Sequence, residues 1–284
     1  IEELRQLLRA YDDMVQEQRR QGNRLIYLLK QYYPAALRLF CQPYRLIALA
    51  FLEKYPTPEL GRALTLDDIR QFLREHRYSG RKIDVKAIEM YEELQAPAPT
   101  AGVQAGMVLH VQMLIPILRH IYNDRTELRK RIVHAFPGHP DAAWWQTIPG
   151  ASNLTGARLL AWIGDDRERF PTANALQATA GTVPVTRRSG KSKTVEFRKG
   201  CSHKLRSAAD DLARQSVKKS KWAREYYDAQ LARGHGSARA YRALANRWLG
   251  IIWKLWQTRI AYDEKVHMAN RLKSQPKAEL QRAG

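Results

Sequence analysis

The stretch IEELRQLLRAYDDMVQEQRRQGNRLIYLLKQYY, residues 1–33, decides the fold class of this chain. Its mostly apolar positions recur at alternating steps of four and three, which places them on one stripe of an α-helix. We predict one long helix that ends at Pro34. Gln18 and Gly22 interrupt the stripe, so it fits a helix packed on its own domain or an imperfect intersubunit coiled coil. The stripe consists of Leu4, Leu8, Tyr11, Val15, Gln18, Gly22, Leu25, Leu29 and Tyr32.

The rest of the chain also has helical patterns. Residues 35–95 predict short helices joined by turns, and Thr65 is the expected N-cap of one of them. One segment differs, because β-prone runs at 182–186 and 194–198 flank a Ser-Gly-Lys turn and predict a short β-hairpin or extended loop. The predicted fold class is therefore mainly α. Its remaining helical patterns cover residues 107–135, 147–180, 203–232 and 238–272.

Composition shifts divide the chain into segments. The clearest linker has two prolines and two glycines among small residues. The chain has no initiator Met and opens inside a helical pattern, so we expect it to be part of a longer protein. The expected segments are a long basic helix plus short helices (1–95), the linker (96–106), a long connecting helix (107–146), a helical domain with the hairpin (147–272) and a disordered tail (273–284).

The charge of the chain points to a polyanionic partner. It has 48 Lys and Arg against 28 Asp and Glu, a formal net charge of +20. Residues 181–260 alone hold 19 basic and 5 acidic residues, a net charge of +14. Neutralising phosphates releases counterions, so nucleic acid is the natural partner. No apolar run is long enough to cross a membrane, no signal peptide is present, and two distant cysteines fit a reducing cytoplasm.

A second motif, TIPGASNLTGARLL at residues 147–160, has the beginning of a helix-hairpin-helix. Gly150 would let the backbone approach a DNA phosphate, and the following helix N-terminus would supply free N–H groups. Ser152 stands where such turns usually carry a second glycine, and Thr155 is expected to cap the helix. The alternative is an ordinary helix connection with Thr155 as a local cap.

The basic turn of the predicted hairpin contains a candidate nucleophile. Ser189 is preceded by Arg187 and Arg188 and followed by Gly190 and Lys191. Cationic side chains stabilise an alkoxide and the charge that develops on an attacked phosphodiester. Ser192 and Ser202 are nearby competitors with the same chemistry. We expect further DNA-backbone contacts from Lys193, Arg198, Lys199, Lys204 and Arg206.

Other candidate sites are weaker. The tryptophans of residues 222–256 could stack on bases, but Leu244, Trp248 and Ile252 have the helical spacing of a core. No metal site is expected. Two-metal chemistry needs converging carboxylates, whereas adjacent pairs such as Asp165 and Asp166 point in different directions on a helix.

Taken together, the order of the motifs resembles transposases of the insertion-sequence one-ten family, which include bridge-RNA-guided recombinases and are related to Piv-type DNA invertases. The similarity covers nearly the whole chain. The landmarks are Arg24-Leu25, Tyr33-Pro34, residues 52–58, Leu73-Arg74, Gly80-Arg81, Ile148-Pro-Gly150, Thr155-Gly-Ala157, Ile163-Gly-Asp165, Arg169-Phe-Pro171, Ala180-Gly181, Pro184, Ser189-Gly-Lys191, Lys199-Gly200, Leu205-Arg206, Tyr226-Tyr227 and Arg233-Gly234.

This resemblance implies a transposase or site-specific recombinase that handles DNA through a nucleophilic serine. The residue that matches the serine motif is Ser189, with Ser192 as the main alternative. The resemblance also implies a phosphoserine–DNA intermediate, a homo-oligomer (dimer or tetramer), and a RuvC-like nuclease domain with acidic ligands for Mg²⁺. A structured guide RNA is a further expected partner.

The strands that would carry those acidic ligands are not found in this sequence, so we expect the chain alone to be inactive. A noncatalytic nucleic-acid-binding module or degenerate transposase remnant is the alternative. The expected location is the cytoplasm of a bacterium or archaeon, at the nucleoid.

Overall fold

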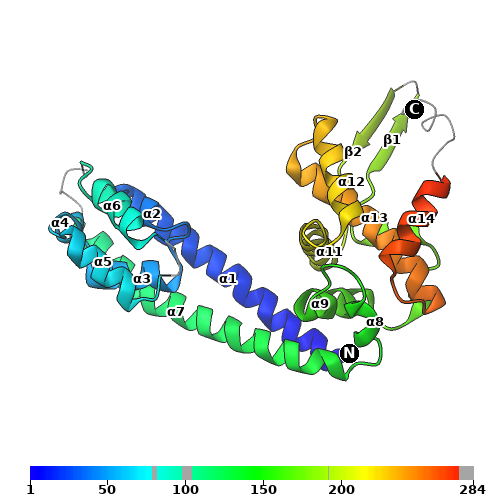
Figure 1. Cartoon of the computed structure of the whole chain (residues 1–284), viewed down its shortest axis with the longest axis horizontal. Helices are drawn as coiled ribbons and strands as arrows, with labels where there is room; N and C mark the ends of the chain where they lie inside the picture. Colours follow the sequence, from blue (N-terminus) through cyan, green and yellow to red (C-terminus); the bar gives the residue numbers. More distant parts are fainter. Residues whose placement is uncertain (79–81, 98–103, 191, 275–284) are drawn as a thin grey trace. The chain divides into compact units, whose positions relative to one another are not determined.

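The computed structural model describes residues 1–78, 82–97, 104–190 and 192–274, except for the side chains of Gln104, Lys193, Leu272 and Ser274. These residues form fourteen α-helices and one antiparallel two-stranded sheet, so the predicted mainly-α class is confirmed (Figure 1). None of the helices in the described ranges is long and apolar enough to cross a membrane. Gly80, Arg81, Lys191, the middle of the expected linker and the tail from residue 275 lie outside the described residues.

The chain divides into two compact units. Residues 10–128 form the first, called here the helical unit, and residues 1–9 with 129–284 form the second, called the hairpin unit. The helices that contribute to the helical unit are α1 (Glu2–Tyr32), α2 (Ala36–Leu39), α3 (Leu46–Lys54), α4 (Pro58–Arg62), α5 (Leu66–Glu75), α6 (Ile83–Leu94) and α7 (Gln104–Ala135).

The predicted stripe of the first helix is confirmed in α1. Seven of its nine positions are buried, and Tyr11 and Val15 are half-buried. In the helical unit the stripe packs into the unit's own core, where Leu25 and Leu29 belong to one buried cluster with Phe51 and Leu118. The chain therefore covers this part of the stripe with its own helices, as the first of the two interpretations predicts.

The two interruptions of the stripe have specific partners. The amide oxygen of Gln18, which is only 6% exposed, accepts a hydrogen bond from Arg125 on α7. A Cβ atom on Gly22 would lie 2.8 Å from the ring of Tyr44, so only glycine lets this ring lie against α1. Each exception to the apolar pattern therefore has a partner from another element: Gln18 binds Arg125, and Gly22 leaves space for the Tyr44 ring.

The N-cap predicted at Thr65 is confirmed. The Thr65 hydroxyl accepts a hydrogen bond from the Asp68 backbone N–H, and the Asp68 carboxylate accepts one from the Thr65 backbone N–H at 2.9 Å. This reciprocal capping box satisfies two backbone donors at the start of α5.

The hairpin unit consists of short helices and the sheet. Its core lies between α9, α11 and α13, where Trp248 is fully buried and donates a hydrogen bond to the Ser216 hydroxyl at 2.8 Å. The elements are α8 (Ala142–Gln146), α9 (Asn153–Ile163), α10 (Ala173–Thr179), β1 (Val185–Ser189), β2 (Ser192–Glu196), α11 (His203–Ser216), α12 (Lys221–Ala232), α13 (Ser237–Thr258) and α14 (Glu264–Ser274), with 3₁₀ turns at Phe136–Gly138 and Arg167–Arg169.

Three of the predicted helical patterns can be compared in detail. The pattern over 203–232 consists of two helices, and Ser220 caps the start of the second, α12. The pattern over 238–272 also consists of two, because Arg259 takes the left-handed conformation (φ 55°) and ends α13. The long helical pattern over 107–135 is confirmed, since α7 ends at Ala135, and the rest of the segment expected as a connecting helix (136–146) forms the turn at Phe136–Gly138 and α8. Pro137 cannot continue the backbone ladder of a helix.

Candidate nucleic-acid interface

The predicted β-hairpin is the most exposed regular element of the hairpin unit. Strands β1 and β2 pair in antiparallel register from Val185 opposite Glu196 to Ser189 opposite Ser192. Every described side chain from Thr186 to Gly190 and from Thr194 to Phe197 is exposed. The strands extend away from the helices in Figure 1. An isolated two-stranded ribbon is marginally stable in water, so this hairpin depends on its attachment at the base.

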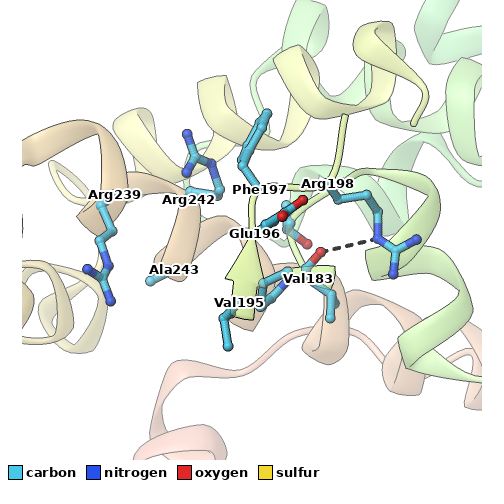
Figure 2. A pocket seen from close by; sticks show the side chains of 11 residues that line it. Val183, Val195, Glu196, Phe197, Arg198, Arg239, Arg242 and Ala243 are labelled. Atoms are coloured by element: carbon cyan, nitrogen blue, oxygen red, sulfur yellow. Dashed lines mark hydrogen bonds between the residues drawn. The ribbon is translucent and has the colours of Figure 1, made fainter. Parts of the chain in front are cut away.

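Arginine side chains make that attachment. Arg198 donates to the Val183 carbonyl at 3.2 Å and thereby joins the two ends of the hairpin (Figure 2). The Arg206 guanidinium donates to the backbone carbonyls of Ala180 and Arg198. It also lies 4.4 Å from the ring centroid of Phe197. Arg198 and Arg206 were predicted as DNA contacts, and the structure gives both of them a structural role at the hairpin base.

Both candidate nucleophiles lie at the distal end of the hairpin. Ser189 is the last residue of β1 and pairs directly with Ser192 on β2, while Gly190 begins the turn with a φ of 55°. Residues directly opposite each other in a sheet project on the same face, so these two hydroxyls share one face. Strand geometry puts Arg187 on that face as well and Arg188 on the other. The register therefore does not separate Ser189 from Ser192.

The charges around the serines are only partly neutralised. Arg187 pairs with Glu196 at 3.4 Å, an exposed and therefore weak ion pair. Arg188 and Ser189 are exposed and make no side-chain hydrogen bond to other described residues. Lys191 and the side chain of Lys193 lie outside the described part of the chain.

A cavity of about 380 Å³ lies at the base of the hairpin (Figure 2). Arg198 lines it from the hairpin side, and Arg239 and Arg242 line it from the first turns of α13. The Arg242 guanidinium lies 4.3 Å from the ring centroid of Phe197, so Arg206 and Arg242 both contact this ring. Arg239 and Arg242 were not among the predicted contacts, although their three-residue spacing on one helix places them on one face.

A buried carboxyl lies close to these arginines. Burial raises the pKa of Asp210 above its usual range, and the neighbouring guanidiniums of Arg242 and Arg214 oppose that rise. Asp210 lies on α11 and does not line the cavity.

The Pro-Gly turn is folded differently from the prediction. Ser152, not Thr155, is the N-cap residue of α9, and its side chain makes no capping hydrogen bond. Thr155 lies one turn inside the helix and is only 7% exposed. The predicted cap at Thr155 is therefore wrong, because the helix begins before this residue.

Gly150 in the same turn has a packing role. Its φ is 94°, and an added Cβ would lie 2.7 Å from the backbone nitrogen of Ser216 at the end of α11. The glycine therefore lets α11 approach the turn. Of the three predicted phosphate contacts, Gly150, Ser152 and Thr155, Ser152 is the exposed one, and it lies beside the N-terminus of α9.

We expect Gly150→Ala to destabilise the hairpin unit by about 2–4 kcal/mol, from the left-handed backbone and from overpacking against α11. Thermal unfolding measures this loss. Gly200→Ala is the matched control, because a Cβ on Gly200 would meet nothing within 4 Å. Equal melting temperatures for the two variants would contradict the packing role.

The remaining predicted contacts differ in their surroundings. The Lys204 ammonium lies 5.0 Å from the ring centroid of Trp162, in cation–π range. Lys199 is exposed and has no ion-pair partner among the described residues. The aromatic residues of the basic segment are mainly core, as their spacing predicts: Trp222, Trp248 and Trp256 are each at most 2% exposed. They cannot serve as open stacking platforms in this conformation.

In the described ranges, no group of three His, Cys, Asp or Glu side chains could hold a metal ion. The described residues therefore do not form the acidic Mg²⁺ site that the family resemblance implies.

The chain is similar to a transposase family and to proteins of insertion elements. Residues 143–228 match the family model described as Transposase IS116/IS110/IS902 family, which covers α8 to most of α12 and the whole hairpin. The chain is 33% identical over 275 residues to the "Mini-circle putative transposase for IS117" of Streptomyces coelicolor, covering 91% of this chain and 64% of that protein.

Two further relatives come from insertion elements. The chain is 27% identical over 270 residues to the 43.6 kDa protein of insertion element IS110 of Streptomyces coelicolor, covering 93% of this chain and 65% of that protein. It is also 27% identical over 219 residues to the 42 kDa protein of insertion element IS900 of Mycobacterium paratuberculosis, covering 76% and 54%. The chain thus spans less than two thirds of the length of these relatives.

Proposed function

We propose that this relative of the IS110/IS116 family transposases carries the DNA-handling part of a transposase or site-specific recombinase, and that its hairpin presents the nucleophile Ser189. The observation that carries the proposal is the exposed basic hairpin, which lies entirely within the family-matched segment and whose first strand ends in Ser189. A two-stranded ribbon is also narrow enough to enter the major groove of B-DNA.

In the proposed reaction, the Ser189 Oγ attacks the phosphorus of a DNA phosphodiester. The bond from phosphorus to the leaving strand breaks, and the freed oxygen takes up a proton. One phosphodiester is thus exchanged for a phosphoserine ester. A strand-end hydroxyl then attacks the phosphoserine, reforms a DNA phosphodiester and releases the serine. Arg187 and Arg188 would stabilise the negative charge that develops on the phosphoryl oxygens.

The proposed reaction needs groups beyond these residues. Acidic ligands for Mg²⁺ and a base for the serine proton would come from a nuclease domain outside this chain. A structured guide RNA and assembly as a dimer or tetramer belong to the same proposal, which rests on the family resemblance for them. The chain by itself would then bind DNA without cutting it.

The test is covalent trapping. The full-length protein, incubated with a suicide DNA substrate that loses its leaving strand, should give a protein–DNA adduct that survives denaturing electrophoresis. The competing function is a noncatalytic nucleic-acid-binding module, which would bind with a steep salt dependence and give no adduct under any conditions.

The arginines at the hairpin base should contribute to DNA affinity. We expect Arg239→Gln to weaken binding several-fold and to lower the salt slope of binding by about 0.9, the value for one neutralised phosphate on B-DNA. Fluorescence anisotropy at a series of salt concentrations measures both. Arg233→Gln is a matched control, since Arg233 is exposed near the end of α12 and does not line the cavity. A smaller loss for Arg239→Gln than for the control would argue against a role for this cavity.

A further inference from the structure

The helical unit contains a cavity that the proposed function does not use. Its volume is about 600 Å³, and it is lined from α1, the loop between α2 and α3, the end of α5, and α7. Its polar lining includes three arginines, Arg45, Arg77 and Arg125, together with Gln18, Tyr44 and Tyr122. All of these residues belong to the same compact unit.

The two interruptions of the α1 stripe help to form this cavity. Gln18 stands where an apolar residue would continue the seam, and it accepts the hydrogen bond of Arg125. Gly22 leaves the space that the Tyr44 ring occupies against α1. An apolar side chain at position 18 would not bind Arg125, and any side chain at position 22 would collide with the Tyr44 ring. The two exceptions to the helical pattern therefore let these polar side chains line the cavity.

The cavity has an excess of positive charge. No carboxylate lines it among the described residues. The carboxylate of Glu17, next to Gln18 in the sequence, accepts hydrogen bonds from Arg20 and Gln21 on α1, and Glu53 pairs with Arg119. Arg45 and Arg77 are exposed and have no carboxylate partner in the described part of the chain. Arginine clusters without acidic neighbours are suited to phosphate, which accepts two parallel N–H donors from one guanidinium.

The backbone of Arg77 strengthens this assignment. Arg77 follows α5 with a φ of 48°, its N–H bonds to the Arg74 carbonyl, and the Tyr78 N–H bonds to the Leu73 carbonyl. This pattern is the helix ending at which glycine is favoured, because a side chain is strained in the left-handed region. The chain places a guanidinium at a position where glycine would suit the fold better, as is seen at functional sites.

We propose that this cavity binds a backbone phosphate of a polynucleotide, as a second contact separate from the hairpin. Arg45 and Arg77 would bind the phosphate at the mouth of the cavity, and Arg125, held by Gln18, would contribute from its inner wall. The shared chemistry is the phosphodiester, which DNA and RNA both present. The assignment does not depend on Ser189 being a nucleophile.

The test measures binding of the chain to a single-stranded RNA and to a DNA duplex of the same sequence. The double variant Arg45→Gln/Arg77→Gln should weaken binding to at least one of them by about ten-fold. For each phosphate that the variant no longer neutralises, the salt slope should also fall by about 0.9 on the duplex or about 0.7 on a single strand. A loss of affinity confined to one polymer identifies the occupant of the cavity.

The matched control is Arg19→Gln/Arg24→Gln. It removes the same charge from exposed positions on α1 that do not line the cavity. Equal losses for the two double variants on both polymers would overturn the proposal. Ser189→Ala should leave this binding unchanged, so the phosphate site and the nucleophile can fail independently.

A single substitution separates binding from folding. Arg77→Gly removes the guanidinium and relieves the strained backbone, so its melting temperature should equal or exceed that of the original chain. Its affinity for the polymer identified above should nevertheless fall several-fold. If the affinity of Arg77→Gly is unchanged, the proposal is wrong.

Discussion

Replacing Ser189 with alanine is expected to abolish the covalent protein–DNA adduct, with adduct formation slowed by on the order of 10³-fold or more, because no other group can replace a lost nucleophile. The substitution removes a single exposed hydroxyl from the end of β1, and the strand pairing uses only backbone groups. Fold and DNA affinity should therefore be retained. The measurement is the rate of adduct formation by the full-length protein on a suicide DNA substrate.

The control is built into the hairpin. Ser192 is the direct cross-strand partner of Ser189, is also exposed, and has the same chemistry. Ser192→Ala should keep the adduct at a rate within a few-fold of the original protein. An adduct that persists in Ser189→Ala and disappears in Ser192→Ala would exchange the two assignments, and an adduct that persists in both would place the nucleophile elsewhere.

Replacing Trp248 with alanine is expected to lower the free energy of unfolding of the hairpin unit by about 3–5 kcal/mol, the usual cost of deleting a large buried aromatic side chain. Trp248 is fully buried on α13, and its ring centroid lies 4.7 Å from that of Trp222. Its indole N–H is the hydrogen-bond donor to the buried Ser216 hydroxyl. The substitution would therefore open a cavity and leave a buried hydroxyl short of one partner.

The lower stability of the hairpin unit should also affect the hairpin itself. Helix α13 also carries Arg239 and Arg242, which line the cavity at the hairpin base, so looser packing of α13 weakens that support. Denaturant unfolding followed by tryptophan fluorescence and circular dichroism measures the stability. Trp253→Ala is the comparison, because Trp253 is only half-buried and donates a hydrogen bond to the Phe170 carbonyl. A loss for Trp253→Ala as large as that for Trp248→Ala would contradict the proposed core.

Regular features of this fold could be predicted from the sequence because local patterns determine them. The α1 stripe follows from helical periodicity, and the hairpin follows from two β-prone runs around a glycine turn. The Thr65 cap needs only its own residue and Asp68 three positions later. In each case the decisive interactions are close together in the sequence.

Features that depend on distant residues could not be predicted. Gly150 fits a phosphate-binding turn by sequence, but its neighbour in space is Ser216 on α11. The carbonyl partners of Arg206, on Ala180 and Arg198, could not be predicted from its sequence, and its DNA contact stays a prediction. Arg259 ends α13 in the left-handed conformation (φ 55°), although no glycine or proline in the residues around it marks a break.

The candidate site divides in the same way. The charge of residues 181–260 and the hairpin could be predicted, whereas the contribution of Arg239 and Arg242 to the hairpin base depends on how α13 packs. The choice between Ser189 and Ser192 remains a prediction from the family resemblance, since the strand register places the two hydroxyls on one face.

The most direct test of the central claim is to digest the trapped protein–DNA adduct with protease and nuclease and to locate the modified residue by mass spectrometry. The proposed function predicts one peptide with a nucleotide remnant on Ser189. A remnant on Ser192, on Ser202 or on any residue outside the hairpin would contradict it.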